Sequence, residues 1–312
     1  MRLDGSNMLR EATEGCRAVL LCATDAEAEP VRAALRGAQS HLVATKSIHV
    51  GGLPVDVSGA RAGVGDPTVR VALGVSGCDK ANAAHLLTCL LQAMTPAPRL
   101  VVQFGIGGAF PSAGPGPGAG VGDIVVATHE IYSDTGSSSP EKWLSAAELG
   151  LPIAQVDGVE LGGTFPLDVD LALAATGAME DIDWSDIAGP EFAVAPEDAA
   201  WPTGVGRPNA APAVLMGTCL TASRVTGLRG QAEQAVARWG ALAESMEGAA
   251  AAHVCTLYRV PFLEIRGISN IVVDRDRASW QVERAIAVAG RATLAVMRAA
   301  DALPLAVPEG AA

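Results

Sequence analysis

Short apolar runs alternate along the chain with alanine-rich segments of helical length. The apolar runs have the length of buried strands, and the segments between them have the small-residue content of closely packed helices. This alternation is typical of an α/β protein whose sheet is covered on both faces. We therefore predict a three-layer α/β/α fold with a mixed central β-sheet. The predicted strands are residues 17–23, 69–75, 100–104, 123–131, 213–216 and 261–268. The predicted helices are residues 26–36, 80–94, 169–179, 230–239, 248–258 and 279–302.

Two further segments, 41–50 and 54–60, alternate apolar and polar residues as antiparallel strands do. Gly51 and Gly52 stand between them, and glycine pairs are favoured in tight hairpin turns because they accept positive φ. We predict a hairpin that turns at these glycines. Its antiparallel pairing is the reason for expecting a mixed sheet.

Two stretches interrupt the alternation. Residues 111–120 are all Pro, Gly, Ala or Ser, which predicts a mobile loop instead of a helix or strand. Residues 180–209 are rich in acidic residues, Pro and Gly, and we interpret them as an insertion. Its aromatic residues would anchor it in part; they are Trp184, Phe192 and Trp201.

The same pattern predicts the domain organisation. We expect a single domain over residues 17–303 that contains both insertions, preceded by an N-terminal extension, residues 1–16. Residues 304–312 contain two prolines among small residues and are expected to form a flexible tail.

Composition narrows the class of partner. The formal net charge is −12, so the surface repels phosphate backbones and anionic lipids, and we expect neither nucleic acid nor membranes as partners. The first apolar run is too short for a signal-peptide core, and no stretch approaches the roughly 20 apolar residues of a membrane span, so we expect a cytoplasmic protein. The six cysteines form no C-x-x-C pair and are interpreted as reduced, buried thiols. The five histidines lack metal-ligand spacing, so we expect no metal and no cofactor.

Ligands of open α/β sheets bind at the carboxyl ends of strands, so polar residues there are site candidates. After the first predicted strand, Glu27 and Glu29 lie in the first turn of a predicted helix. The helix macrodipole favours acidic residues at that place in any protein. A purely structural role for both glutamates therefore stays open.

A glycine cluster, Gly105, Gly107 and Gly108, directly follows the predicted strand 100–104. Glycines let a ligand approach the backbone and expose N–H groups to it. A dinucleotide-binding fingerprint would need G-x-G-x-x-G at the start of a helix. Because these glycines lead into a Pro/Gly-rich loop instead, we exclude that type of site.

Two later segments carry further candidates. Met246 and Glu247 precede a run of one glycine and four alanines, and small residues at consecutive positions imply a helix buried all round, where a charge needs a partner. A solvated glutamate remains the alternative. The last predicted strand leads into Ser269 and Asn270, whose side chains both donate and accept hydrogen bonds. Asparagine at a strand end also commonly caps a turn.

In this order, the four segments resemble the nucleoside phosphorylase and nucleosidase superfamily over about residues 17–300. The most specific element is the M-E-G-A run ahead of R-G-I-S-N. The resemblance implies a nucleoside phosphorylase-like fold, a homo-oligomer and a small nucleoside substrate. It also implies an N-glycosyl hydrolase, which cleaves the bond between a purine base and ribose with water.

The resemblance assigns roles around the sugar. Glu27, in preference to Glu29, would hold and activate the water. Met246 and Glu247 match the pair that contacts the ribose, with the glutamate binding its hydroxyls. Two carboxylates suit an oxocarbenium-like transition state, in which the ribose gains positive charge.

The resemblance also assigns roles around the base. Gly107 and Gly108 match a glycine loop beside the sugar and base, and Ser269 is assigned to substrate binding. Asn270 takes the place of an aspartate that protonates the base in adenine-specific members. An amide can donate to a 6-oxo group but cannot act as a general acid, so Asn270 suits hypoxanthine better than adenine. A proton for the base could then come from Asp274 or Asp276.

Within the superfamily, the chain looks like the branch that hydrolyses futalosine to hypoxanthine and dehypoxanthine futalosine on a route to menaquinone. Residues 244–248, 266–270 and 274–276 with Trp280 favour that branch. The alternatives are a phosphate-dependent purine nucleoside phosphorylase, a methylthioadenosine or S-adenosylhomocysteine nucleosidase, and a non-catalytic nucleoside-binding protein. Arg61 and Arg224 are the only basic residues we could nominate to hold a phosphate, and neither lies in a phosphate motif.

Overall fold

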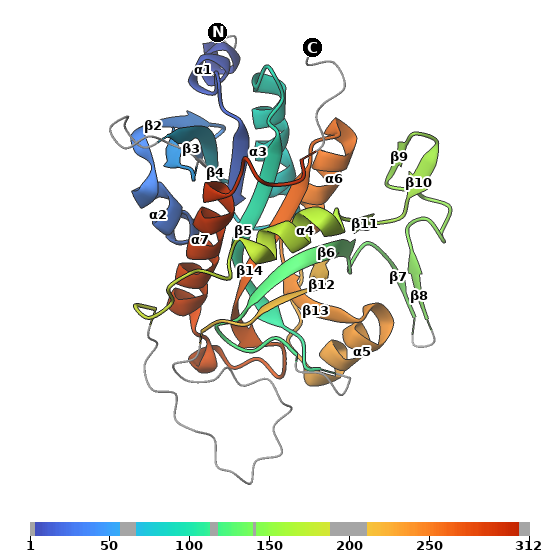
Figure 1. The fold of residues 1–312 in the computed structure, drawn as a ribbon. Coiled ribbons are helices and arrows are strands. Elements are labelled where there is room, and N and C mark those ends of the chain that lie inside the picture. The colour runs from blue at the N-terminus through green and yellow to red at the C-terminus, as the bar shows by residue number, and fades with distance from the viewer. Residues whose placement is uncertain (1–3, 57–66, 113–117, 140–141, 188–210, 306–312) are drawn as a thin grey trace.

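The computed structural model of the chain describes residues 4–56, 67–112, 118–139, 142–187 and 211–305. Within these ranges the main sheet has ten strands, with helices on both faces (Figure 1). Its strands lie in the order β11-β6-β12-β13-β5-β1-β4-β3-β2, and β14 pairs with both β5 and β6. Parallel and antiparallel neighbours both occur, so the mixed sheet predicted from the sequence is confirmed.

The elements have the following bounds. The strands of the main sheet are β1 (Ala18–Cys22), β2 (Arg36–Val43), β3 (Lys46–Pro54), β4 (Thr68–Val75), β5 (Leu100–Ala109), β6 (Ile124–Tyr132), β11 (Thr164–Pro166), β12 (Val214–Thr221), β13 (Ala241–Ser245) and β14 (Phe262–Ile271). Two small hairpins pair β7 (Gly136–Ser138) with β8 (Trp143–Ser145) and β9 (Ala154–Val156) with β10 (Val159–Leu161). The helices are α1 (Asp4–Ala12), α2 (Asp25–Ala34), α3 (Lys80–Ala93), α4 (Val169–Gly177), α5 (Arg229–Trp239), α6 (Gly248–Tyr258) and α7 (Val282–Arg298), with a 3₁₀ turn η1 (Arg277–Ser279).

Alternate residues of β1 pack into two different hydrophobic cores, one on each face of the sheet. Leu20 belongs to the core that contains buried residues of α2 and α7, such as Val31. Val19 belongs to the core that contains buried residues of α3 and α6, such as Leu86. Successive side chains of a strand point to opposite faces, so a strand covered on both sides must be apolar at every position. The predicted three-layer arrangement is confirmed.

Five strands of the main sheet close into a ring. β5 pairs with β14, β14 with β6, β6 with β12 and β12 with β13, and β13 returns to β5. One cluster of buried, mostly small residues draws on all five strands. To take part, β5 leaves its partner β1 after Gln103 and reaches β13 at Gly108.

The path of β5 corrects one prediction. The glycine cluster at residues 105–108 was expected to follow a strand that ends at Phe104, but it lies inside β5, which continues to Ala109. The register of β5 against β14 runs through all three of its glycines. The glycines of β5 therefore lie beyond the carboxyl ends of β1 and β4.

A hairpin is present, but it is not the predicted one, because its turn lies inside residues 41–50, which were expected to form its first strand. The chain turns at Ala44 and Thr45, both with positive φ, between β2 and β3. Gly51 and Gly52 lie within β3 instead. A Cβ atom at Gly51 would come within 3.0 Å of the Arg36 carbonyl oxygen, so glycine permits close approach between strands there. Residues 57–60 of the expected second strand lie outside the described residues.

The expected insertions lie only partly in the described residues. Before residue 188, Trp184 packs against a main core, and Arg291 of α7 pairs with Asp186 (2.6 Å). Phe192 and Trp201 lie outside the described residues, as do residues 113–117 and 306–312.

The cysteines and the helices bear on what was expected from composition. All six cysteines are free thiols, but Cys78 is exposed, which corrects the prediction that all are buried. None of the helices in the described part of the chain has both the length and the apolar content needed to cross a bilayer.

Candidate active site

Glu27 is fixed at the point where β1 leads into α2. It forms a capping box with Thr24: the Thr24 hydroxyl accepts from the Glu27 N–H, and Glu27 Oε2 accepts from the Thr24 N–H (2.9 Å). The same oxygen accepts from the Ala23 N–H (3.1 Å). Glu27 thus has a structural role at the helix N-terminus, which the sequence left open, and it has this role as part of a capping box.

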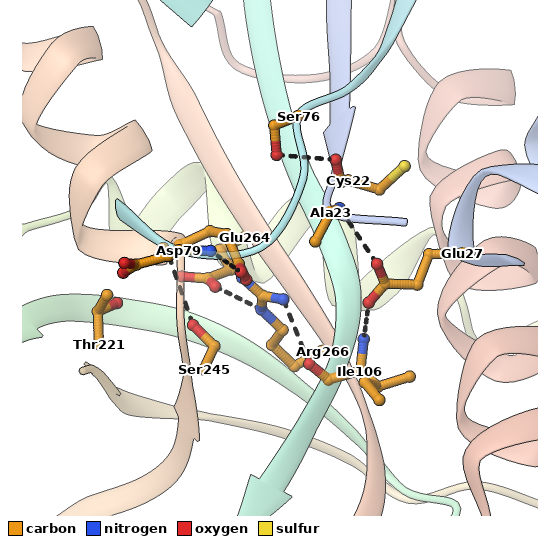
Figure 2. Close-up of polar contacts among 12 residues, drawn as sticks. Cys22, Ala23, Glu27, Ser76, Asp79, Ile106, Thr221, Ser245, Glu264 and Arg266 are labelled. Carbon is orange, nitrogen blue, oxygen red and sulfur yellow. Dashed lines mark hydrogen bonds and ion pairs between the residues drawn. The ribbon is translucent and has the colours of Figure 1, made fainter. Parts of the chain in front are cut away.

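Capping is only part of the role of Glu27. Its second oxygen, Oε1, accepts from the backbone N–H of Ile106 in β5 (2.9 Å), and the side chain is buried (Figure 2). Gly105 makes this approach possible, because a Cβ atom there would lie 2.4 Å from Glu27 Oε1 and 3.1 Å from Arg266 Nη1. Glu27 and Arg266 thus border the same glycine.

Glu247 stands in the turn between β13 and α6, immediately before the first helical residue, Gly248. Its Oε1 accepts from the backbone N–H of Asp79 (2.9 Å), and its Oε2 lies 3.5 Å from Arg266 Nη2. The side chain is 4% exposed. Burial raises the pKa of Glu247, and the charge of Arg266 opposes that shift.

Arg266 connects the two glutamates. Its Nε donates to Glu264 (2.6 Å) and its Nη1 donates to the Ile106 carbonyl (3.2 Å), as Figure 2 shows. Burial by itself would lower the pKa of Arg266, but the charges of Glu264, Glu247 and Glu27 raise it above its ordinary value, so the guanidinium stays cationic. Nη2 is buried without a hydrogen-bond partner. A buried donor without a hydrogen-bond partner, here beside the Glu247 carboxyl group, is suited to bind a water or a substrate oxygen.

Asp79 orients Glu247 from the turn that follows β4. Its φ of 87° and ψ of 153° lie in a region that is strained for any residue but glycine, at a cost of about 1–3 kcal/mol. Its side chain accepts hydrogen bonds from the Lys80 N–H (2.7 Å) and the Ser223 hydroxyl (2.7 Å). These contacts hold the strained turn with its N–H directed at Glu247.

Ser269 and Asn270 lie further along β14, where Asn270 is in register with Gly108 of β5. The Ser269 hydroxyl is in donor reach of Asn270 Oδ1 (2.8 Å) and of the Gly107 carbonyl (3.2 Å). Asn270 Nδ2 donates to the Ile271 carbonyl (3.3 Å), which leaves one amide hydrogen for another acceptor. The amide nitrogen is thus the part of Asn270 available to a ligand.

The predicted site residues therefore form two neighbouring groups. Glu247 pairs with Arg266, and Glu27 borders the same glycine, Gly105, as Arg266 does. The second group, Gly107, Gly108, Ser269 and Asn270, lies further along β5 and β14. Met246 is half-buried in the turn that carries Glu247.

The other residues weighed from the sequence are exposed wherever the structure describes them. Glu29 is exposed and pairs with Arg32. Asp274 accepts from the Arg229 N–H (3.0 Å), and Asp276 caps the turn η1. Arg224 is exposed, and Arg61 lies outside the described residues.

Sequence reasoning missed the roles of Arg266 and Asp79. A signal for Arg266 was available: Glu264 and Arg266 are two residues apart in an otherwise apolar strand, which places both on one face. No local signal marks Asp79, because its function depends on a backbone conformation that the sequence does not reveal.

The sequence is similar to a known protein family and to enzymes within it. The sequence model of the phosphorylase superfamily matches residues 17–303. The chain is 33% identical to a futalosine hydrolase of Streptomyces coelicolor over 190 residues, 60% of each chain. It is 28% identical to a futalosine hydrolase of Thermus thermophilus over 217 residues, 70% of this chain and 76% of the relative. The matched part thus spans less than two thirds of the Streptomyces protein.

A solved structure shares the fold. It is a 5′-methylthioadenosine/S-adenosylhomocysteine nucleosidase from Colwellia psychrerythraea in complex with adenine, with a TM-score of 0.66 and 21% identity. The match covers 91% of this chain and 95% of that one. The predicted nucleoside phosphorylase-like fold is confirmed.

Proposed function

The chain belongs to the phosphorylase superfamily, and from this premise we propose that it is an N-glycosyl hydrolase that releases hypoxanthine from futalosine. The other product would be dehypoxanthine futalosine, an intermediate of menaquinone biosynthesis. The observation that carries the proposal is the convergence of Glu27 and Glu247 on Arg266, whose Nη2 has no hydrogen-bond partner. The similarity to two futalosine hydrolases supports the choice of substrate.

Water activation falls to Glu27 and Arg266. Nη2 of Arg266, which has no hydrogen-bond partner, offers a hydrogen bond to the oxygen of a water, and Glu27 offers the carboxyl oxygen that takes the proton of that water. The backbone donors around Glu27 fix that carboxyl group in one orientation. Fixed groups of this kind lower the barrier because they need no reorganisation during the reaction.

Glu247 serves the ribose. Its carboxyl group, oriented by the Asp79 N–H, binds the sugar hydroxyls. As the bond to the base stretches, the ribose ring gains positive charge, and two nearby carboxyl groups stabilise that charge. Water then adds at the anomeric carbon as the base departs.

Asn270 selects the base. Ser269 donates to Oδ1 of Asn270, which leaves the amide hydrogen free to donate to the 6-oxo group or N7 of hypoxanthine. Negative charge on the departing base is stabilised by this hydrogen bond. Adenine presents a donor amino group at the same position and fits the amide less well.

Base release with and without phosphate tests the proposal. Purified protein is incubated with futalosine, inosine or methylthioadenosine in phosphate-free and phosphate-containing buffer, and free base is measured by chromatography. We expect hypoxanthine from futalosine in both buffers. Release only with phosphate would establish phosphorolysis, preference for methylthioadenosine would establish the adenine-specific activity, and intact futalosine in both buffers would refute the proposal.

A further inference from the structure

Two buried glutamates next to Arg266 have no part in the reaction described above. Glu130 lies on β6 and Glu264 on β14, and neither is exposed at all. Both carboxyl groups border the first residue of α6, because a Cβ atom at Gly248 would lie 2.4 Å from Glu130 Oε1 and 2.4 Å from each oxygen of Glu264. Two acidic side chains of distant strands thus meet inside the protein.

One oxygen of each carboxyl group lacks a donor. Glu130 Oε1 and Glu264 Oε2 are buried without a hydrogen-bond partner. Gln103, in register with Glu264 on β5, makes no hydrogen bond to either group. Two ionised carboxylates cannot share a site of low dielectric, whereas one proton between them satisfies both oxygens.

The surrounding hydrogen bonds decide which glutamate holds the proton. The Thr221 hydroxyl accepts from the Ala249 N–H (2.7 Å), so its own hydrogen is donated to Glu130 Oε2 (2.7 Å). Glu264 Oε1 accepts from Arg266 Nε (2.6 Å), which stabilises a negative charge on Glu264. The two oxygens that remain, Glu130 Oε1 and Glu264 Oε2, each lie 2.4 Å from the same Cβ position at Gly248, so a proton on Glu130 can be directed at Glu264.

We propose that Glu130 is a carboxylic acid at neutral pH that donates its proton to Glu264 and thereby positions Arg266. The hydrogen bonds then run without a break from the first turn of α6 through Thr221, Glu130 and Glu264 to the guanidinium. Glu130 is a positioning residue, since it acts on the reaction only through Glu264 and Arg266. This consequence for turnover rests on the proposed function, whereas the protonation of Glu130 does not.

The charges around Glu130 favour the protonated form. Burial raises the pKa of Glu130 well above its ordinary value, the nearby charge of Glu264 raises it further, and the Thr221 hydroxyl and the charge of Arg266 oppose the shift. Glu247 adds negative charge near Glu264. Cys219 and Tyr132, which also lie close, stay neutral because burial raises the pKa of both.

Infrared spectroscopy of the full chain without substrate tests the protonation. At about pH 7.5, we expect the difference spectrum of wild type minus Glu130→Gln to contain the carbonyl stretch of a protonated carboxyl group, whereas the band of Glu244, whose pKa is about 7, is common to both proteins and cancels. Glu148→Gln is the matched control, because Glu148 is exposed and hydrogen bonds from Ser145 lower its pKa, so the band must persist there. Identical bands in wild type and Glu130→Gln would overturn the proposal, whatever the substrate proves to be.

Kinetics test the positioning role. Glutamine at position 130 can accept from Thr221 and donate to Glu264, so we expect Glu130→Gln to keep kcat within about threefold of the wild type, whereas Glu130→Leu loses about 100-fold in kcat through displaced catalytic groups. The wild type should lose activity at alkaline pH as Glu130 ionises, and Glu130→Gln should lack that loss. Equal damage in both variants, or an unchanged pH profile in Glu130→Gln, would overturn the role.

The two measurements remain informative separately. A wild type that cleaves no nucleoside contradicts the proposed function, while its infrared band still decides where the proton lies. If Glu130→Leu does not fold, the pH profile of Glu130→Gln still decides the positioning role.

Discussion

Glu27 accepts more hydrogen bonds than a capping residue needs. We expect Glu27→Gln to reduce kcat by about 100-fold or more, because an amide cannot take a proton from water, while the affinity for futalosine stays within about threefold. Turnover and calorimetric binding measure the two effects. Glu29→Gln is the matched control, since Glu29 lies on the same helix but is exposed and pairs with Arg32, and it should keep full activity. Unchanged turnover in Glu27→Gln would remove Glu27 from the mechanism.

Glu244 gives the protein a pH dependence of its own. Burial raises its pKa to about 7, while the Thr226 N–H and Arg275 oppose the shift. An acid with a raised pKa in the folded state stabilises the fold below its ordinary pKa of about 4.5 and loses that contribution as pH rises through about 7. Burial shifts the pKa of Glu130 and Glu247 in the same direction.

Urea unfolding checks this dependence. Between about pH 5 and pH 8, the free energy of unfolding of the wild type should fall by about 2 kcal/mol relative to that of Glu244→Gln. Glutamine keeps the acceptor for Thr226 but does not ionise. Parallel pH dependence in the two proteins would show that Glu244 does not titrate in this range.

Residue-level reasoning from the sequence reached the acidic and amide groups but not their partners. Glu27, Glu247 and Asn270 could be nominated because each follows or precedes a recognisable element, and polar residues at such places are conspicuous. The strained backbone of Asp79 could not be predicted, nor could the Nη2 of Arg266 that lacks a hydrogen-bond partner, because both result from tertiary contacts. Conformational strain and missing partners leave no mark in composition or periodicity.

At the scale of elements, the start of α6 is restricted by what surrounds Gly248. Alanine normally stabilises a helix relative to glycine by roughly 0.5–1 kcal/mol. At Gly248 a methyl group would collide with the carboxyl groups of Glu130 and Glu264, so we expect Gly248→Ala to lower the free energy of unfolding by about 1–3 kcal/mol. A methyl group at Gly230 of α5 would meet open space, so Gly230→Ala should raise the free energy of unfolding. Denaturant midpoints compare the two variants, and an equally stable Gly248→Ala would show that the carboxyl groups can move aside.

Helices and strands with a strong sequence pattern were predictable, whereas those whose form depends on pairing with other strands were not. The bounds of α6 match the prediction, because an alanine run between a polar turn and a strand permits little else. β13 escaped prediction because Ala241–Ser245 is short and contains no β-branched residue, and its strand form comes from pairing with β12 and β5. The turn at Ala44 and Thr45 escaped for a related reason, since glycines nearby offered a stronger local signal.

At the scale of the whole molecule, the candidate site exists only when distant segments come together. Glu27 follows β1, Asp79 follows β4, Ile106 lies in β5, and Glu247 and Arg266 come from the last third of the chain. The alternation of strands and helices predicted a layered sheet, which brings the ends of β1, β4 and β5 close together. The closure into a ring of β5, β14, β6, β12 and β13 was not predictable, because it depends on β5 leaving β1 after Gln103 and pairing with β13 from Gly108.

Because no single segment forms the site, a base that fits it should stabilise the entire fold. A ligand that binds only the folded state at about 100 times its Kd adds about 2.7 kcal/mol, which raises Tm by roughly 5 °C for a chain of this size. We expect hypoxanthine to raise Tm more than adenine does at equal concentration, since the free amide hydrogen of Asn270 meets an oxo group in one base and an amino group in the other. Asn270→Asp should reverse the order, because a carboxylate repels the oxo group and accepts from the amino group. Differential scanning calorimetry measures the Tm increase caused by each base in the wild type and in Asn270→Asp. Equal increases with hypoxanthine and adenine in the wild type would contradict the assignment of Asn270 as the residue that selects the base.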